Sequence, residues 1–112
     1  MQNNISPLIS VIMNCYNGEK FLKKSIQSVL KQKYKKWELI FWDNKSNDNS
    51  KEIALSFKDK RIKYFKAAKF TKLYEARNLA VSKAKGQFIC FIDTDDWWMA
   101  KKLSSQVRII KK

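Results

Sequence analysis

Apolar residues are distributed along the chain in two alternating patterns. Short runs of consecutive apolar residues, rich in β-branched and aromatic side chains, are separated by segments in which apolar residues recur every three or four positions. The first pattern is typical of buried strands and the second of amphipathic helices. The sequence therefore predicts four strands that alternate with four helices. The expected strands are residues 8–13, 37–42, 61–65 and 88–92, and the expected helices are residues 19–33, 72–85, one that ends near residue 58 and one that begins near residue 101.

Strands joined by helices and short loops indicate an α/β fold in which a mostly parallel sheet carries helices on both faces. Residues 88–92 are apolar throughout, as in a strand buried on both faces, whereas residues 61–65 alternate, as in a half-exposed strand near an edge. Gly86 is expected to follow the end of the third helix. The predicted buried helix positions are Phe21, Leu22, Ile26, Val29, Leu30, Ile53, Ala54, Phe57, Leu73, Ala76, Leu79, Ala80, Ala84, Leu103, Val107 and Ile110.

Polar segments follow three of the predicted strands. They are residues 14–17, 43–48 and 93–96, and each contains side chains able to bind a ligand. Parallel strands bring their carboxyl ends to one edge of the sheet, and the ligands of such sheets bind there. The sequence therefore predicts that the three segments converge on one site.

Three carboxylates, Asp93, Asp95 and Asp96, lie within four positions directly after the apolar run 88–92. Like charges this close repel each other unless a cation lies between them. A hard divalent cation, Mn²⁺ or Mg²⁺, bound by one or two carboxylates and by phosphate oxygens would meet this need. A helix N-terminus also favours acidic residues, and Asp96 fits that alternative because a helical pattern follows it.

The chain of 112 residues is long enough for one small domain with one core, and its net charge is +14, mostly from lysine. Three explanations of this charge remain open: a solvated surface, attraction to anionic lipid, and attraction to phosphate-bearing ligands. No DNA- or RNA-binding motif is present, and the excess of lysine over arginine argues against a nucleic-acid partner.

The chain contains two cysteines and no histidine. The lack of histidine excludes the usual zinc sites and the Ser-His and Cys-His nucleophile pairs. Cys15 and Cys90 lie in or beside apolar runs and are expected to be buried free thiols in a reducing compartment. The sequence shows neither a signal-peptide pattern nor an apolar run as long as a membrane span, so we expect a cytoplasmic location.

Three segments, taken in order, resemble a known family. They are residues 10–32, residues 37–50 and residues 75–98, which end in Asp-Thr-Asp-Asp-Trp-Trp. Together they are similar to the N-terminal, nucleotide-sugar-binding half of family 2 glycosyltransferases with the GT-A fold. The resemblance covers the chain from about residue 9 onward. It implies a Rossmann-like nucleotide-binding half whose sheet has the strand order 3-2-1-4.

The resemblance also implies roles for particular residues of this chain. Residues 93–95 would form an Asp-x-Asp motif, in which Asp95, with Asp93 beside it, ligates the Mn²⁺ or Mg²⁺ that holds the diphosphate of a UDP-sugar or similar donor. Asp93 would also lie near the ribose and the sugar. Tyr16 and Asn17 would bind the donor, with Tyr16 against the base. The alternative for Tyr16 is an aromatic side chain that closes the end of the sheet.

Four more residues are matched by the resemblance. Asp43 and Asn44 would face the base and the ribose, and Arg77 and Asn78 would reach the nucleotide or donor from the third helix. The alternative for the last two is a surface pair on a helix. At position 44 the family usually has a second Asp, which would accept a hydrogen bond from a uracil N3–H. An Asn can accept through its oxygen or donate through its NH₂, so the nucleotide stays open.

The sequence departs from the family pattern in its length as well as at position 44. In inverting members the acceptor site and the catalytic carboxylate base lie in the half that follows the metal motif. We therefore expect residues 1–112 to be a single, truncated donor-binding domain with no assignable base. Residues 87–92 would then form an apolar sheet edge, through which we expect the chain to form homo-oligomers.

Three hypotheses about function follow. The first is a glycosyltransferase donor-binding domain that serves a glycan or lipid-linked acceptor, cytoplasmic or peripheral at the inner face of the membrane. The second is a catalytically inactive module that binds nucleotides or self-assembles. The third is a basic adaptor for polyanions, which would bind them with a steep dependence on salt.

Overall fold

The computed structural model describes residues 6–110, which form an alternating β/α chain. The predicted order of elements is confirmed, although the first three helices are shorter than expected. The strands are β1 (Ile9–Cys15), β2 (Trp37–Asp43), β3 (Ile62–Lys66) and β4 (Phe88–Phe91), and the helices are α1 (Glu19–Leu30), α2 (Ser50–Ser56), α3 (Leu73–Val81) and α4 (Lys102–Ile110).

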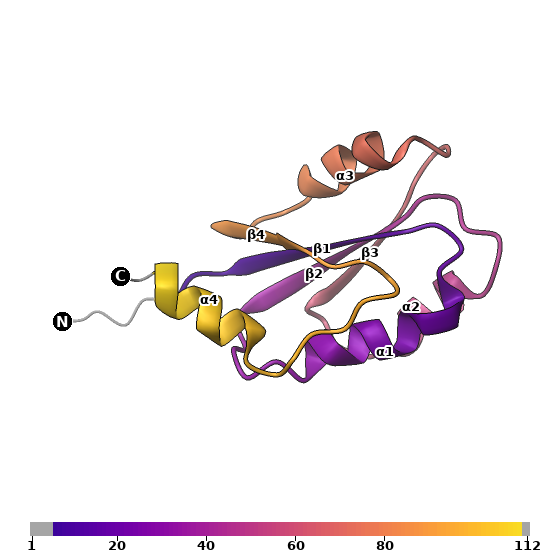
Figure 1. Ribbon diagram of the computed structural model, residues 1–112. Helices are drawn as coiled ribbons and strands as arrows, with labels where there is room; N and C mark the ends of the chain where they lie inside the picture. The colour runs from indigo at the N-terminus through magenta and orange to yellow at the C-terminus, as the bar shows by residue number, and fades with distance from the viewer. Residues whose placement is uncertain (1–5, 111–112) are drawn as a thin grey trace.

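The four strands form one parallel sheet in the order β3-β2-β1-β4, as predicted. β1 and β2 pair along their whole length, from Ile9 opposite Trp37 to Cys15 opposite Asp43. Helices cover both faces: α3 lies on one face, and α1, α2 and α4 lie on the other (Figure 1). In the sheet β1 lies between β2 and β4, so its carboxyl end lies between the ends of these two strands.

Side chains of alternating direction divide the core into two layers, as expected for strands covered on both faces. Val11 and Met13 of β1 pack with α1, α2 and α4, whereas Ile12 packs with α3. The α3 layer is thin because Ala76 and Ala80 are the residues of this helix that are buried against the sheet. Small side chains let the helix approach the strands closely.

The prediction that β4 is buried on both faces is wrong. Phe88, Ile89 and Phe91 are 38%, 41% and 50% exposed, because β4 is an edge strand that pairs with β1 alone among the described strands. Ile92, just beyond the strand, is buried as predicted. Self-association through this edge stays a prediction.

Several predicted core positions on the helices are also corrected. Phe21, Leu73 and Leu79 are exposed, and the two leucines flank the narrow alanine stripe through which α3 packs. The burial pattern of α3 is thus narrower than its apolar sequence pattern. Ile110, predicted to face the core, has a side chain outside the described ones.

The prediction for Gly86 is wrong as well. α3 ends at Val81, and Gly86 has no positive φ. Its importance is steric, because a Cβ at this position would lie 2.7 Å from the backbone oxygen of Leu8 and 2.6 Å from Oγ of Ser10. Gly86 lets the chain pass against β1 before it enters β4.

A buried polar network holds this passage in place. Ser10 Oγ donates a hydrogen bond to Glu38 Oε2 at 2.6 Å, the Lys85 N–H donates to the same oxygen at 2.6 Å, and the Gly86 N–H donates to Ser10 Oγ at 2.8 Å. Lys63 Nζ lies 3.6 Å from Glu38 Oε1. Between the end of α3 at Val81 and the start of β4, the chain thus reaches the Glu38 carboxylate through the Lys85 N–H.

Cys15 and Cys90 are free thiols, as predicted. Cys15 is buried and Cys90 is half-buried, and burial raises the pKa of both thiols. Both are therefore protonated and weakly nucleophilic near neutral pH. None of the helices described between residues 6 and 110 is long and apolar enough to cross a bilayer.

Glu38→Gln tests the buried network. Burial by itself would raise the Glu38 pKa, but the Lys85 N–H, the Ser10 hydroxyl and the Lys63 ammonium together lower it. A lowered pKa stabilises the fold above the ordinary value of about 4.5, and that stability is lost as the pH falls through the lowered pKa. We expect the variant to lose about 1–3 kcal/mol of unfolding free energy at pH 7.

Urea unfolding of both proteins over a pH series is the measurement. The difference between them should shrink as the pH falls below about 4.5, since the wild-type carboxylate then becomes protonated. A difference that stays constant with pH would show that the charge of Glu38 contributes nothing.

Candidate functional site

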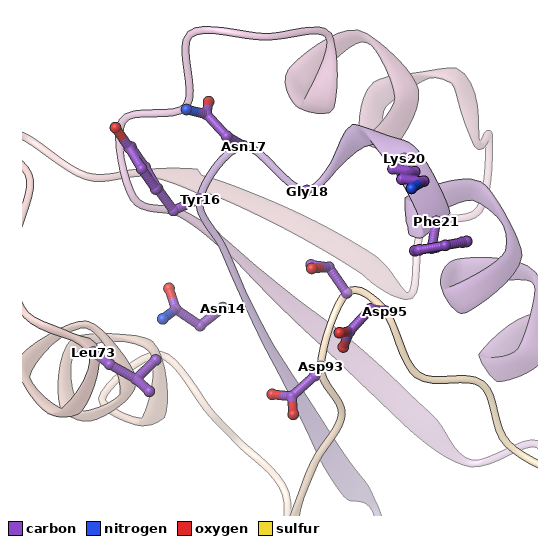
Figure 2. A pocket seen from close by; sticks show the side chains of 10 residues that line it. Asn14, Tyr16, Asn17, Gly18, Lys20, Phe21, Leu73, Asp93 and Asp95 are labelled. Atoms are coloured by element: carbon purple, nitrogen blue, oxygen red, sulfur yellow. The ribbon is translucent and has the colours of Figure 1, made fainter.

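A pocket of about 500 Å³ opens at the carboxyl ends of β1 and β4 (Figure 2). Its walls come from the end of β1 with the turn that follows, the first turn of α1, the loop after β4, and the start of α3. Four residues predicted to bind the donor or the metal are among its lining. The lining residues are Asn14, Tyr16, Asn17, Gly18, Lys20, Phe21, Leu73, Asp93, Thr94 and Asp95.

The turn after β1 is tied to the loop after β2. Asn17 has a left-handed backbone with φ of 51°, a conformation that asparagine tolerates well. Its N–H donates to Ser46 Oγ at 2.9 Å, and its Oδ1 accepts from the Asn47 N–H at 2.8 Å. The Asn44 N–H donates to the Cys15 oxygen at 2.8 Å. The predicted convergence of these two segments is therefore present.

The acidic loop after β4 is held against α1. Ser25 Oγ of α1 and the Asp96 N–H both donate to the backbone oxygen of Asp93 at 3.0 Å. Gly18, just before α1, lies so close that a Cβ there would be 2.7 Å from Oγ1 of Thr94. The third predicted segment thus meets the turn that precedes α1, and Gly18 permits the contact, whereas residues 43–48 join this turn from its other side and do not line the pocket.

Asp93 and Asp95 place two exposed carboxylates in the pocket, whereas Asp96 is exposed and outside it. Between residues 6 and 110 there is no group of three or more Cys, Asp or Glu side chains arranged to hold a metal ion. Two carboxylates suit Mg²⁺ or Mn²⁺ when a ligand supplies phosphate oxygens. Lys20, at the pocket wall, adds a positive charge for such an anion.

Arg77 and Asn78 of α3 do not line the pocket. The Arg77 guanidinium pairs with Asp93 Oδ1 at 3.5 Å and lies 5.5 Å from the ring of Phe91. Both partners of the ion pair are well exposed, so it contributes little stability. Asn78 is exposed on the helix surface. Their predicted contact with the donor stays a prediction.

Asp43 and Asn44 are buried at the end of β2 rather than exposed in the pocket. Asp43 accepts hydrogen bonds from the Ser46 N–H at 2.9 Å and from the Tyr64 hydroxyl. Burial and this carboxylate raise the pKa of Tyr64. Asn44 clamps Thr71, accepting from its N–H at 3.1 Å and donating to its oxygen at 2.9 Å. Contact of either residue with a base or ribose stays a prediction.

Asn14 was predicted only as part of the polar segment 14–17, with no role of its own. It interrupts the apolar run of β1, and Figure 2 shows its amide between β1 and Leu73. Its Oδ1 is buried, and no described residue donates a hydrogen bond to it. An unpaired buried acceptor is unfavourable unless a ligand completes it. A lone amide in an otherwise apolar strand was the signal that could have identified it.

The other residues that line the pocket were harder to predict from the sequence. Lys20 and Phe21 follow a predicted site turn by a few positions, so their place in a first helical turn could have indicated them. Thr94 lies between two predicted ligands. Leu73 matched a buried helix face in the sequence, and its exposure at the pocket had no sequence signal.

One wall of the pocket is aromatic and apolar. Tyr16 is 51% exposed, and its ring packs edge-on against Phe70 with the centroids 4.8 Å apart. Leu73 lies on the same side of the pocket (Figure 2). The carboxylates lie on the other side. The pocket can therefore accept a ligand with a flat apolar end and a charged end.

Comparison with known proteins agrees with this fold. The model of glycosyl transferase family 2 matches residues 10–112. UDP-Glc:alpha-D-GlcNAc-diphosphoundecaprenol beta-1,3-glucosyltransferase WfgD of Escherichia coli is 44% identical over 105 residues, which are 94% of this chain and 42% of WfgD. Putative teichuronic acid biosynthesis glycosyltransferase TuaG of Bacillus subtilis is 33% identical, over 96% of this chain and 43% of its own length.

Solved structures share the fold. The crystal structure of Staphylococcus aureus TarS 1-349 in complex with UDP-GlcNAc superposes with a TM-score of 0.88 and 27% identity, over 92% of this chain and 31% of TarS. The predicted GT-A fold is therefore confirmed for this chain. The chain spans about two fifths of the length of the curated relatives it matches. With the family model covering nearly all of the described residues, this chain belongs to glycosyl transferase family 2.

Proposed function

We propose that the pocket binds a nucleoside-diphosphate sugar, with a UDP-sugar favoured, and that the chain is the donor-binding part of a glycosyltransferase. The observation that carries this proposal is the placement of Asp93 and Asp95 in a pocket at the carboxyl ends of β1 and β4. Two relatives support the donor class. WfgD takes its name from UDP-Glc, and TarS, 27–28% identical to this chain, was crystallised with UDP and with UDP-GlcNAc.

The charged side of the pocket would receive the diphosphate. Asp93 and Asp95 would hold Mn²⁺ or Mg²⁺, because hard cations take carboxylate and phosphate oxygens together. When bound, the ion supplies positive charge to the diphosphate leaving group. The Lys20 ammonium is placed to attract the same anion, and the Arg77 guanidinium lies beside Asp93.

The other side of the pocket would receive the nucleoside. Tyr16, supported by Phe70, offers an aromatic surface for the base, and Asn17 lies in the same turn. Asn14 Oδ1 would accept a hydrogen bond from a base N–H or a ribose hydroxyl. Asp43 and Asn44 hold the neighbouring loops and are the next candidates for the base and ribose.

The acceptor is proposed from the relatives. The names of WfgD and of WfaP, 36% identical to this chain, include a diphosphoundecaprenol lipid. We infer a glycan or lipid-linked acceptor for the whole enzyme. No described residue is assigned as the base that removes the acceptor proton.

Asp95→Asn tests the metal role, with Asp96→Asn as a control of equal charge change outside the pocket. We expect Mn²⁺ to strengthen UDP binding about 10-fold or more, which is ~1.4 kcal/mol. Asp95→Asn should abolish this gain, because it removes a ligand oxygen charge. Calorimetry with UDP, in Mn²⁺ and in chelator, is the measurement. A UDP affinity that does not change with Mn²⁺ would contradict the assignment of Asp95 as a metal ligand. So would an equal loss of the Mn²⁺ effect in both variants.

Asn14→Leu separates ligand binding from folding. The variant removes an unpaired buried acceptor, so its unfolding free energy should be unchanged or slightly higher. UDP affinity should fall by about 5–10-fold, equivalent to ~1 kcal/mol for one lost hydrogen bond. Thermal unfolding without ligand and calorimetry with UDP measure the two effects. Unchanged UDP affinity would remove Asn14 from the site, and a clear loss of stability would show that the protein itself uses the amide.

A further inference from the structure

Large apolar side chains are exposed at the rim of the donor pocket and beyond it, on α1 and on the segment between β4 and α4. Phe21, Trp97 and Met99 are 40%, 46% and 83% exposed. Phe21 is in the first turn of α1, and Trp97 and Met99 belong to the connection between β4 and α4, which runs beside α1 (Figure 1). We call this surface the Trp97 patch. It consists of Lys20, Phe21, Lys24, Lys31, Trp97 and Met99.

Lysines surround the aromatic rings of the Trp97 patch. The rings of Phe21 and Trp97 are 6.0 Å apart between centroids. Lys24 Nζ lies 3.8 Å from the centroid of Trp97, and Lys20 Nζ lies 5.3 Å from that of Phe21. A shallow groove of about 210 Å³, lined in part by Lys24, Lys31 and Trp97, continues the surface. Positive charge and exposed apolar area therefore occur together.

The loop that carries Trp97 and Met99 is anchored at its far end. Gln32 Nε2 donates to the Met99 oxygen at 2.7 Å, and Gln32 Oε1 accepts from the Leu103 N–H at 3.0 Å. The Lys33 N–H donates to the Ala100 oxygen at 2.9 Å. The buried glutamine thus holds the backbone of Met99, while the side chain of Met99 extends into solvent.

This combination matches the chemistry of a bilayer surface. Tryptophan favours the boundary between lipid tails and headgroups, because its ring is apolar and its N–H is polar. Lysines beside such a ring bind anionic headgroups, and each contributes when it lies near the surface. The net charge of +14 adds long-range attraction to the same surface.

We propose that the Trp97 patch docks the protein on an anionic lipid bilayer. Trp97 and Met99 enter the headgroup region, and Lys24 and Lys31 contact the anionic headgroups. Phe21 and Lys20 belong to both the patch and the wall of the donor pocket, so docking brings the pocket to the bilayer surface. The proposal does not depend on the donor or on the metal.

Co-sedimentation of the 112-residue chain with vesicles tests the docking. We expect binding to vesicles of phosphatidylglycerol and phosphatidylcholine, and much weaker binding to phosphatidylcholine alone. Lys24→Gln with Lys31→Gln should weaken binding about 25-fold, since each lysine near the surface contributes roughly 5-fold. The matched control is Lys83→Gln with Lys85→Gln, which removes the same charge just after α3 on the other face of the sheet. It should weaken binding less than about 3-fold, an effect of net charge alone.

Tryptophan quenching by brominated lipids tests the apolar part. Trp37 and Trp42 are 1% and 7% exposed, so quenching reports on Trp97 and its neighbour Trp98. Trp97→Ala and Met99→Ser should each weaken vesicle binding by several-fold, and Trp97→Ala should remove most of the quenching.

Three results would overturn the proposal. One is equal weakening by the two lysine pairs, which would mean attraction by net charge without a defined surface. Another is vesicle binding without quenching, or binding unaffected by Trp97→Ala. The last is equal competition by a soluble polyanion such as heparin, which would identify a general polyanion surface instead of a bilayer surface.

Discussion

The site depends on the close contact between the turn that precedes α1 and the acidic loop that follows β4. β1 is the central strand, so its carboxyl end has a neighbour on each side. Gly18 leaves room for Thr94, and Ser25 holds the backbone of Asp93. Without this contact the carboxylates would lie on a free loop. With it, two short segments distant in sequence form one pocket.

Much of the fold follows from the sequence, because strands and helices have different apolar periods. The strand order came from the family resemblance, and the sheet has that order. Burial was harder to predict. Phe88, Ile89 and Phe91 are as apolar as core residues, but exposure depends on whether another strand lies beside β4. The apolar pattern of this segment predicted burial, whereas the strand order implied by the resemblance predicted a sheet edge, and the structure agrees with the strand order.

The candidate site was predictable in part for the same reason. Tyr16, Asn17, Asp93 and Asp95 follow strand ends, so strand polarity alone brings them together. The burial of Asp43 and Asn44 was not predictable, since a polar residue at a strand end can face a ligand or bind a nearby loop. Here Asp43 is bonded to Ser46 and Asn44 to Thr71, and the positions of these two partners depend on tertiary structure.

The buried side chain of Gln32 has a wider consequence. Through Met99 and Leu103 it joins the end of α1 to the start of α4, while the beginning of α1 carries Lys20 and Phe21 at the pocket. A helix of twelve residues is stiff over its length. The backbone hydrogen bonds of one helix therefore hold the pocket wall at a fixed distance from the junction between α1 and α4, before any ligand arrives.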